Sequence, residues 1–464
     1  THMKGIYPDS VRETANGSVM MANLGDRDAL IATDKTLGFA GKAVGDRLEC
    51  ELTHENAVAL RAAFAFTAPV RVLTRERTLG VGDRLGIATP GHIRAFRAFP
   101  GVSPVFAQQS IRELTLTNRT FDDVLDAASF SVFREGFTEG FGADGDHLKT
   151  PKEVDYALNC GYTMITLDCS EHIRSGVTDE NCAALYEPEP ELEKLYLDRT
   201  FEVGEGVRVS FDERAFRKTA LVYADAVRFA ARIYHEKIAS PSGDRADFEM
   251  SIDETATPTT PAEHFFVASE LDRLGVHAAS VAPRFCGEFQ KGIDYIGDLS
   301  QFEEELKAHA AIARRFGYKL SIHSGSDKFS VFPLIGKETR GRFHVKTAGT
   351  NWLQAVLLIA ERDPKLYREV HAFALKSFPE ARKYYHVTTD LAKVPDLSDL
   401  SDAQLPKLFE QNDARQLIHI TYGLILNEPR LRERLYAAWR RDADALDALV
   451  ATHIERHMKA LLEG

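Results

Sequence analysis

The sequence predicts a (β/α)₈ barrel of the TIM type, with a small α/β appendage before it and a helical extension after it. Two observations support this prediction. From about residue 76 the chain repeats a unit of short apolar strand, polar loop and amphipathic helix. Prolines lie near the expected helix starts, and Gly161 and Gly275 fall where helices should end. This alternation implies parallel strands joined by crossover helices, and eight such units close a barrel.

The eight expected strands follow one another between residues 78 and 350. They are "TLGVGDRLG", "SPVFAQQS", "GFGADGDHLK", "YTMITLDCS", "FEMSIDET", "HAASVAPRF", "KLSIHSGSD" and "RFHVKTAGT". A ninth candidate, "KYYHVTTDL", is placed outside the barrel because "NWLQAVLLIAERD" already supplies a closing helix. A doubly wound open sheet remains the alternative fold.

The chain divides into three predicted parts. Residues 1–75 mix short apolar runs with one helical pattern and form the small α/β appendage. Residues 76–363 form the catalytic barrel, interrupted at about 170–215 by an insertion typical of a lid or an oligomer contact. Residues 364–464 are mainly helical and are expected to pack on the barrel. Whether the protein is a homo-oligomer stays open.

Composition limits the class of protein. The chain has 464 residues, of which 27% are charged, and its formal net charge is −12. This charge argues against a nucleic-acid binder, which would show a basic face. Five cysteines without paired spacing indicate a reducing compartment and offer no thiolate metal site. No signal peptide and no apolar run of membrane-spanning length is present, so we expect a cytoplasmic protein without a membrane partner.

Ionisable side chains face inward at the ends of at least five expected strands. Alternate residues of a barrel strand face the helices or the interior, and the apolar set faces the helices. In "KLSIHS", Leu320 and Ile322 face outward, so His323 faces inward. The same reasoning places further groups inward or at the rim: Asp144, Asp146, His147, Asp168, Glu249, Asp253, Glu254, His344 and Lys346. Burying so many charges is tolerable only if they pair, bind a metal or meet a charged ligand.

Three of these residues, His147, His323 and His344, come from three different strand ends and are typical ligands of a divalent cation. Asp168 is the first substitute for one of them. The metal stays open among Zn, Ni, Co, Mn and Fe. Each of these residues taken alone is also consistent with a structural role.

Acid/base and substrate-binding candidates lie beside the histidines. Asp146 and Glu254 are placed to move protons near a metal. Lys149, Lys346, Lys328 and Arg284 follow strand ends, where cations hold a substrate carboxylate. "GVGDRLG" is one residue too long for the dinucleotide fingerprint, so it is interpreted as a tight turn. "SGSD" after His323 lacks the spacing of a nucleotide loop.

Longer segments resemble the bacterial tagaturonate epimerase family from about residue 80 to the C-terminus. They are "GVGDRLGIATPGHIRA", "PVFAQQSIREL", "EGFGADGDHLK", "SIDETATPT", "GEFQKGIDYIGDL", "LSIHSGSDKFSVFP", "FHVKTAGT" and "RQLIHITYG". The resemblance implies a metal-dependent enzyme whose substrates are the keto-uronates D-tagaturonate and D-fructuronate. It also implies that His147, His323 and His344 bind the metal and that Asp146 and Glu254 form the acid/base pair.

The position of the inverting carbon in the implied reaction restricts the possible mechanisms. The inverting carbon lies two bonds from the ketone, so enolisation alone cannot invert it. Retro-aldol cleavage and re-addition is favoured over oxidation and re-reduction by a nicotinamide, because the dinucleotide fingerprint is missing. Two other functions stay open. One is a metal-dependent aldolase or aldose–ketose isomerase acting on a sugar acid, and the other is a non-catalytic barrel that binds a sugar acid.

Overall fold

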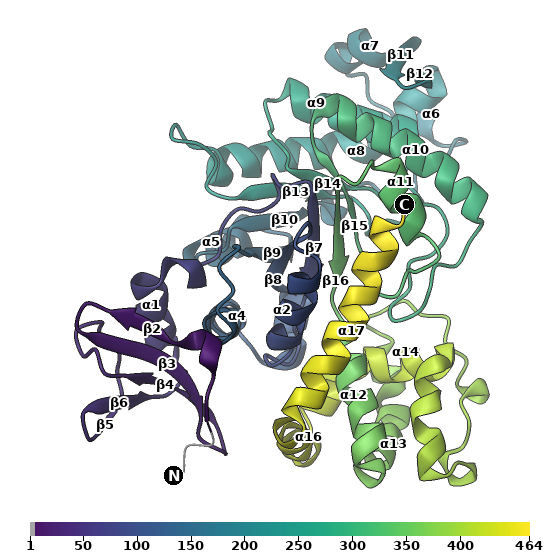
Figure 1. The fold of residues 1–464 in the computed structure, drawn as a ribbon. Helices are drawn as coiled ribbons and strands as arrows, with labels where there is room; N and C mark the ends of the chain where they lie inside the picture. The colour runs from purple at the N-terminus through teal and green to yellow at the C-terminus, as the bar shows by residue number, and fades with distance from the viewer. Residues whose placement is uncertain (1–4) are drawn as a thin grey trace.

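A closed barrel of eight parallel strands forms the centre of the computed structural model, which describes residues 5–464 (Figure 1). The strands are β7 (Arg77–Val81), β8 (Ser103–Ser110), β9 (Gly142–Leu148), β10 (Met164–Asp168), β13 (Asp247–Ser251), β14 (Ser280–Ala282), β15 (Lys319–Ile322) and β16 (Phe343–Thr347). They pair in this order, and β16 pairs with β7 to close the barrel. The predicted barrel is confirmed, and each strand overlaps the segment expected for it. "KYYHVTTDL" contains no strand.

Helices connect successive strands and cover the outside of the barrel. They are α2 (Thr89–Ala98), α3 (Ile111–Thr117), α4 (Phe121–Glu135), α5 (Pro151–Asn159), α8 (Glu213–Ile233), α9 (Pro261–Arg273), α10 (Leu299–Phe316) and α11 (Phe332–Glu338). Capping boxes begin several of them: Ser110 caps α3, Thr120 caps α4, Thr150 caps α5 and Thr260 caps α9. The capping Ser and Thr residues fix the position at which each loop after a strand ends and its helix begins.

The barrel interior is polar instead of filled with aliphatic side chains. Lys319, at the start of β15, donates from Nζ to the Arg75 carbonyl and to Thr78 Oγ1, at 2.8 Å each. Thr78 Oγ1 also lies 2.8 Å from Nδ1 of the fully buried His344. Buried polar groups that bond to one another avoid the cost of desolvation, so this layer is a structural network.

The N-terminal part is a six-stranded sheet with one helix (Figure 1). Its elements are β1 (Gly5–Ile6), β2 (Arg12–Thr14), β3 (Gly17–Asn23), β4 (Asp28–Ala32), β5 (Lys42–Val44), β6 (Arg47–Cys50) and α1 (His54–Ala63). Val19 and Leu30 of this sheet share a buried cluster with Phe130 and Phe133 of α4. The predicted appendage is therefore present and packs on the outside of the barrel.

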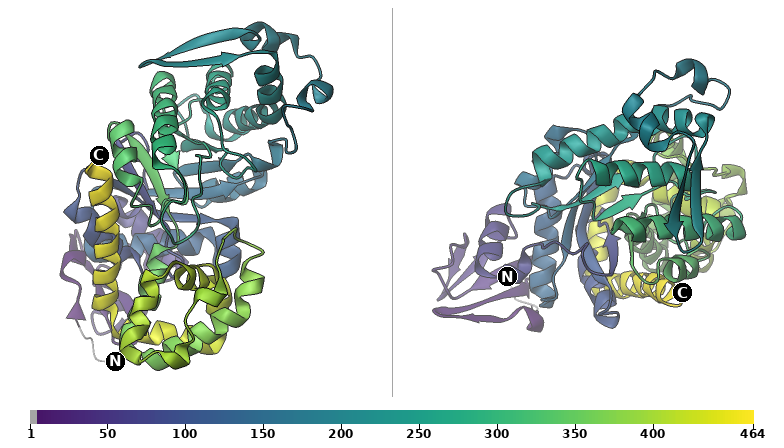
Figure 2. Two further views of the ribbon diagram at one scale, coloured as in Figure 1. Left: turned by 90° about the vertical axis from the view of Figure 1, so that its right-hand side faces the viewer. Right: turned by 90° about the horizontal axis from the view of Figure 1, so that it is seen from above.

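The insertion contains α6 (Cys182–Leu185), α7 (Pro190–Tyr196) and the hairpin β11 (Arg199–Gly204) and β12 (Val207–Phe211). It projects from the barrel at the end far from the C-terminal helices (Figure 2). Phe201 of the hairpin packs on Phe265 of α9, with ring centroids 4.9 Å apart. The hairpin therefore packs against the outer helices.

The C-terminal helices form a second buried cluster beside the barrel (Figures 1 and 2). They are α12 (Thr350–Arg362), α13 (Pro364–Ala381), α14 (Asn412–Ile420), α15 (Tyr422–Leu426), α16 (Pro429–Arg441) and α17 (Ala443–Leu462). Trp352 and Leu353 of α12 belong to this second cluster, whereas Ile454 and Met458 of α17 belong to the barrel cluster. The helix expected to close the barrel thus packs with the extension, and α17 takes its place between α2 and α11. The boundary between residues 363 and 364 stays a prediction. Within the described residues, no helix has the length and apolar character needed to cross a membrane.

Candidate active site

A cavity of about 260 Å³ opens at the C-terminal ends of the barrel strands. Asp146, His147, Asp253 and His323 line it from the barrel, and Tyr385 and His419 line it from the C-terminal part. Active sites of parallel barrels lie at this end, because loops from several strands converge there. The cavity therefore combines strand ends with side chains from the helical extension.

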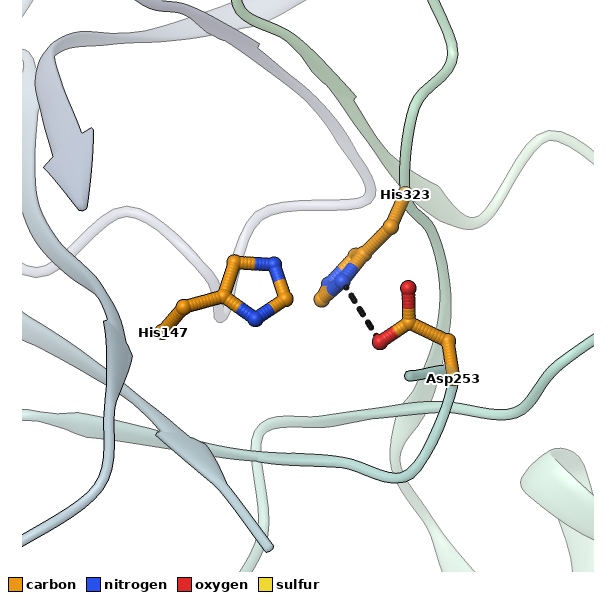
Figure 3. Close-up of side chains that lie close together, drawn as sticks. All are labelled: His147, Asp253 and His323. Atoms are coloured by element: carbon orange, nitrogen blue, oxygen red, sulfur yellow. Dashed lines mark ion pairs between the residues drawn. The ribbon is translucent and has the colours of Figure 1, made fainter. Parts of the chain in front are cut away.

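Two of the predicted histidines face each other across the cavity (Figure 3). The rings of His147 and His323 are perpendicular, with centroids 5.0 Å apart. His147 lies near the end of β9 with φ of 50°, a conformation that costs free energy for a residue other than glycine. Lys149 and Thr150, two and three residues further on, are held by Glu153, whose carboxylate accepts both backbone N–H groups. The helix start thus fixes the turn that presents His147.

Each imidazole has one nitrogen beside a buried carboxylate. His147 Nδ1 lies 3.4 Å from Asp168 Oδ2, and His323 Nε2 lies 2.5 Å from Glu249 Oε1. His323 Nδ1 lies 3.1 Å from Asp253 Oδ1. Burial works against a charge on either ring. The nearest carboxylates outweigh it, so the pKa of His147 is raised and that of His323 rises to about 9.

The residues present fit a divalent cation. One ligand atom from each of His147, Asp253 and His323 lies within 4.8 Å of the other two. His323 has Nε2 on the Glu249 carboxylate, and its buried Nδ1 makes no hydrogen bond within the described chain. His147 has Nδ1 beside Asp168, which leaves Nε2 as its second ligand atom. An imidazole with one nitrogen beside a carboxylate and the other available is the usual arrangement around a metal. His147, Asp168 and Glu254 form a second group of the same kind beside the first.

His344 is not part of this arrangement. It lies inside the barrel, bonded to Thr78, and does not line the cavity. Burial lowers the pKa of His344 well below its usual value. Its Nε2 has no partner within residues 5–464. Of the three predicted imidazole ligands, the structure therefore brings His147 and His323 together with the Asp253 carboxylate and places His344 apart from them.

Lys346 is surrounded by carboxylates. Its Nζ lies 2.9 Å from each of Asp144, Asp146 and Glu249, and its side chain is 4% exposed. Burial disfavours ionised Asp146, but the charges of Lys346, His147 and His323 together outweigh burial, and the pKa of Asp146 falls to about 2. Asp146 is thus an ionised carboxylate at the cavity wall. Lys346 is occupied by these partners, which makes it a poor ligand for a substrate carboxylate.

The other predicted site residues are spread along the rim. Glu254 is exposed at the cavity mouth, next to Asp253. Lys149 lines the cavity and pairs with Glu171 at 3.9 Å. Asp168 orients His147, while Arg284 bonds to the Thr255 carbonyl and lines an adjoining pocket. Eight of the predicted polar residues therefore line one cavity: Asp146, His147, Lys149, Asp168, Asp253, Glu254, His323 and Lys346. Asp144, Glu249, Arg284, Lys328 and His344 do not line it.

Four cationic or imidazole side chains of the cavity were not predicted as site residues: Arg84, Arg112, Lys291 and His419. All four lie in segments already quoted for the family resemblance, "GVGDRLG", "PVFAQQSIREL", "GEFQKGIDYIGDL" and "RQLIHITYG". None is on a barrel strand, so the alternation of inward and outward residues gave no signal for them.

A second cluster with metal-ligand spacing, Asp327, His453 and His457, lies where the loop after β15 meets α17. His457 Nε2 accepts the Asp327 backbone N–H at 2.9 Å, and its Nδ1 donates to the His453 carbonyl at 2.8 Å. His453 Nε2 lies 2.8 Å from Asp327 Oδ1, and Arg415 lies 3.2 Å from the other oxygen. Both nitrogens of His457 are used, so the cluster ties α17 to the loop.

A parallel barrel with imidazoles and carboxylates gathered in a cavity at its strand ends defines a barrel enzyme. Comparison with known proteins gives its class. The family model described as tagaturonate epimerase matches residues 7–461. The chain therefore belongs to the tagaturonate epimerase family and is an isomerase of the epimerase type.

Individual relatives agree with this assignment. The tagaturonate/fructuronate epimerase of Thermotoga maritima is 47% identical over 421 residues, which cover 89% of this chain and 86% of that protein. The crystal structure of the fructuronate-tagaturonate epimerase of Cohnella laeviribosi is 48% identical, with a TM-score of 0.95 over 98% of this chain and 96% of that one. The resemblance inferred from the sequence is confirmed.

Proposed function

We propose that this protein interconverts D-tagaturonate and D-fructuronate in a divalent-metal-dependent reaction. The observation that carries the proposal is the convergence of His147, Asp253 and His323, with Asp146 beside them, in a chain 47% identical to an enzyme named for these substrates. Its five free cysteines favour a reducing compartment, so we place the reaction in the cytoplasm.

The chemistry of the inversion favours a retro-aldol route. The hydroxyl-bearing carbon that inverts is β to the ketone, so its own C–H bond is not acidic. Deprotonation of its hydroxyl allows the bond to the α-carbon to break. The ketone half then becomes an enediolate and the carboxylate half an aldehyde. After the aldehyde turns over, the bond forms again with the opposite configuration.

Asp146 is the proposed base for the hydroxyl proton. The Lys346 ammonium keeps Asp146 ionised, so the carboxylate is able to accept a proton when substrate binds. Glu254, at the mouth of the same cavity, is the proposed acid that protonates the re-formed alkoxide. Since the reaction is reversible, the two carboxyl groups exchange these roles in the opposite direction.

His147, Asp253 and His323 would hold the cation, with Asp168 and Glu249 orienting the two imidazoles. A divalent ion bound there supplies Lewis-acid stabilisation of negative charge on the substrate oxygens. Imidazole and carboxylate ligands are compatible with Zn, Ni, Co, Mn and Fe.

The test is incubation of the purified protein with D-fructuronate before and after chelation, followed by product identification. We expect D-tagaturonate from the metal-supplied protein, loss of turnover after chelation, and recovery when a divalent cation is added back. Absence of the epimer from metal-supplied protein would refute the proposal. Accumulation of three-carbon products or of an aldose would instead indicate an aldolase or an aldose–ketose isomerase.

A further inference from the structure

We propose that Lys291, Arg84 and His419 form an anion pocket that binds the substrate carboxylate, so that the C-terminal helices take part in substrate recognition. The inference rests on the proposed function, because it assigns a place to one end of the proposed substrate. Three independent features of the cavity wall support it.

The first feature is an ammonium group without a carboxylate partner. Lys291 enters the cavity from the loop between β14 and α10, and its Nζ donates to Ser324 Oγ at 3.0 Å. No carboxylate forms an ion pair with Lys291 anywhere in residues 5–464, whereas Lys346 has three such partners. Burial, followed by the charge of Arg84, lowers the pKa of Lys291. Lys291 is therefore a cavity ammonium without a carboxylate of the described chain within ion-pair distance.

The second feature is a guanidinium held rigidly with one nitrogen unused. Arg84 is 1% exposed, its Nε and Nη2 lie 3.1 and 3.0 Å from Glu113 Oε1, and its Cζ lies 3.9 Å from the centre of the Tyr422 ring. Its buried Nη1 has no hydrogen-bond partner among the residues that the structure describes. Leaving such a donor unpaired costs free energy, which an anionic ligand would recover.

The third feature is a buried imidazole with both nitrogens unused. His419 of α14 lines the cavity, and neither ring nitrogen has a partner in the described part of the chain. Burial lowers the pKa of His419, so the ring is neutral and offers one N–H donor. A Cβ atom placed on Gly349 would lie 2.3 Å from His419 Nε2 and 2.8 Å from Arg84 Nη1. The glycine thus keeps open the place where these two nitrogens meet.

The other cations near the cavity are less suitable. Lys149 pairs with Glu171, and Lys346 is neutralised by buried carboxylates. Arg112 is exposed and lies over the Tyr385 ring, while Arg284 lines the adjoining pocket and bonds to a backbone carbonyl. Lys291 contacts Ser324, the residue after the proposed metal ligand His323. A bound carboxylate would therefore lie close to the reacting carbons. In the proposed mechanism this pocket would retain the aldehyde fragment, which carries the carboxylate, while it turns over.

The test compares matched ligands with and without a carboxylate. We would measure the dissociation constants of D-gluconate and of neutral D-glucitol for the metal-supplied protein, and repeat both with Lys291→Met. The wild type should prefer gluconate. Lys291→Met should weaken gluconate binding on the order of 100-fold, as expected when one partner of a buried charged pair is removed, and leave glucitol binding unchanged. Lys383→Met, which removes an exposed lysine just after α13, should change neither constant.

His419→Phe gives a second variant that keeps an aromatic ring against Gly292 and removes the N–H donor. We expect the same selective loss of gluconate, and thermal unfolding will show whether either variant is folded. Absence of a preference for gluconate in the wild type, or an equal loss of affinity for both ligands in folded variants, would refute the proposed anion pocket. If the variants selectively lose affinity for gluconate but the wild type does not epimerise D-fructuronate, the anion pocket would be supported and only the proposed function refuted.

Discussion

Charge compensation distinguishes the polar residues of the cavity from one another. His147 lies beside Asp168, and His323 lies between Glu249 and Asp253, whereas Lys346 is saturated by three carboxylates. Alternation along the strands found these three inward side chains. It also selected His344, because alternation shows which side chains of a strand face inward but not how deep in the barrel they lie. His323 follows the end of β15, but His344 is the second residue of β16 and lies inside the barrel.

The proposed ligand set of His147, Asp253 and His323 predicts which substitutions remove the metal. Asp253→Ala and His147→Ala should each lower the affinity for a divalent cation by at least roughly 100-fold, since each deletes a proposed ligand. His344→Gln should retain the metal. Metal content and titration of the metal-free proteins provide the measurement. Retention in Asp253→Ala together with loss in His344→Gln would restore the three-histidine interpretation.

Lys346 should contribute to stability as well as to activity. Lys346→Met leaves Asp144, Asp146 and Glu249 without their shared counter-ion, which should lower the free energy of unfolding by about 3–5 kcal/mol. Turnover should fall in the same variant because Asp146 loses the charge that keeps it ionised. Denaturant unfolding with Lys337→Met, an exposed lysine, is the control. Equal stability of the two variants would contradict this role.

At the level of elements, the loop after β15 connects the site to the C-terminal helices. Ser324 and Asp327 have positive φ values of 50° and 61°, so the loop is held in a conformation that neither residue prefers. Asp327 is fixed by His453 and Arg415 and donates its N–H to His457. Because His323 begins this loop, the tether should influence the position of a proposed metal ligand. The sequence could not reveal the tether, since its partners are more than 80 residues apart.

Replacing Asp327 by Asn should show the tether as a pH-dependent loss of stability. Burial opposes ionisation of Asp327, but His453 and Arg415 outweigh it, so the pKa of Asp327 is lowered. A lowered pKa stabilises the folded state above the unfolded value of about 4, and this stabilisation is lost as the pH falls below it. Asp327→Asn should therefore lower the free energy of unfolding by about 2 kcal/mol at pH 7.

The difference between Asp327→Asn and the wild type should shrink as the pH falls below about 4. Urea unfolding of both proteins across this range is the measurement. A difference that does not change with pH would show that the charge of Asp327 contributes nothing.

For the whole molecule, the repeated strand–helix pattern was sufficient to predict the barrel, its eight strands and the helical extension. It was not sufficient to predict which helix completes the outer layer. The segment 350–362 follows the last strand directly, but its apolar residues pack in the C-terminal cluster, and α17 covers the barrel instead. Sequence periodicity gives the apolar face of a helix and not its partner. For the same reason the contribution of His419 to the cavity was not foreseen.

Because α17 packs closely on the barrel, adding a methyl group at the contact should lower the stability of the protein. A Cβ atom on Gly336 of α11 would lie 2.0 Å from the Leu461 carbonyl oxygen of α17. Gly336→Ala should therefore shift α17 and lower the free energy of unfolding by about 1–3 kcal/mol. Gly317→Ala is not a suitable control because its φ is positive, so we would use Gly5→Ala, whose Cβ meets no atom within 4 Å. Unchanged thermal stability of Gly336→Ala would contradict the tight packing of this helix.

The proposed inversion breaks a carbon–carbon bond and leaves the C–H bond of the inverting carbon intact. The rate of epimerisation of D-fructuronate carrying deuterium at that carbon, relative to the unlabelled substrate, tests this step. We predict nearly equal rates, with only the small secondary isotope effect of forming an aldehyde at the labelled carbon, and a product that keeps its deuterium. A several-fold slower reaction, or exchange of the label with water, would contradict the retro-aldol route.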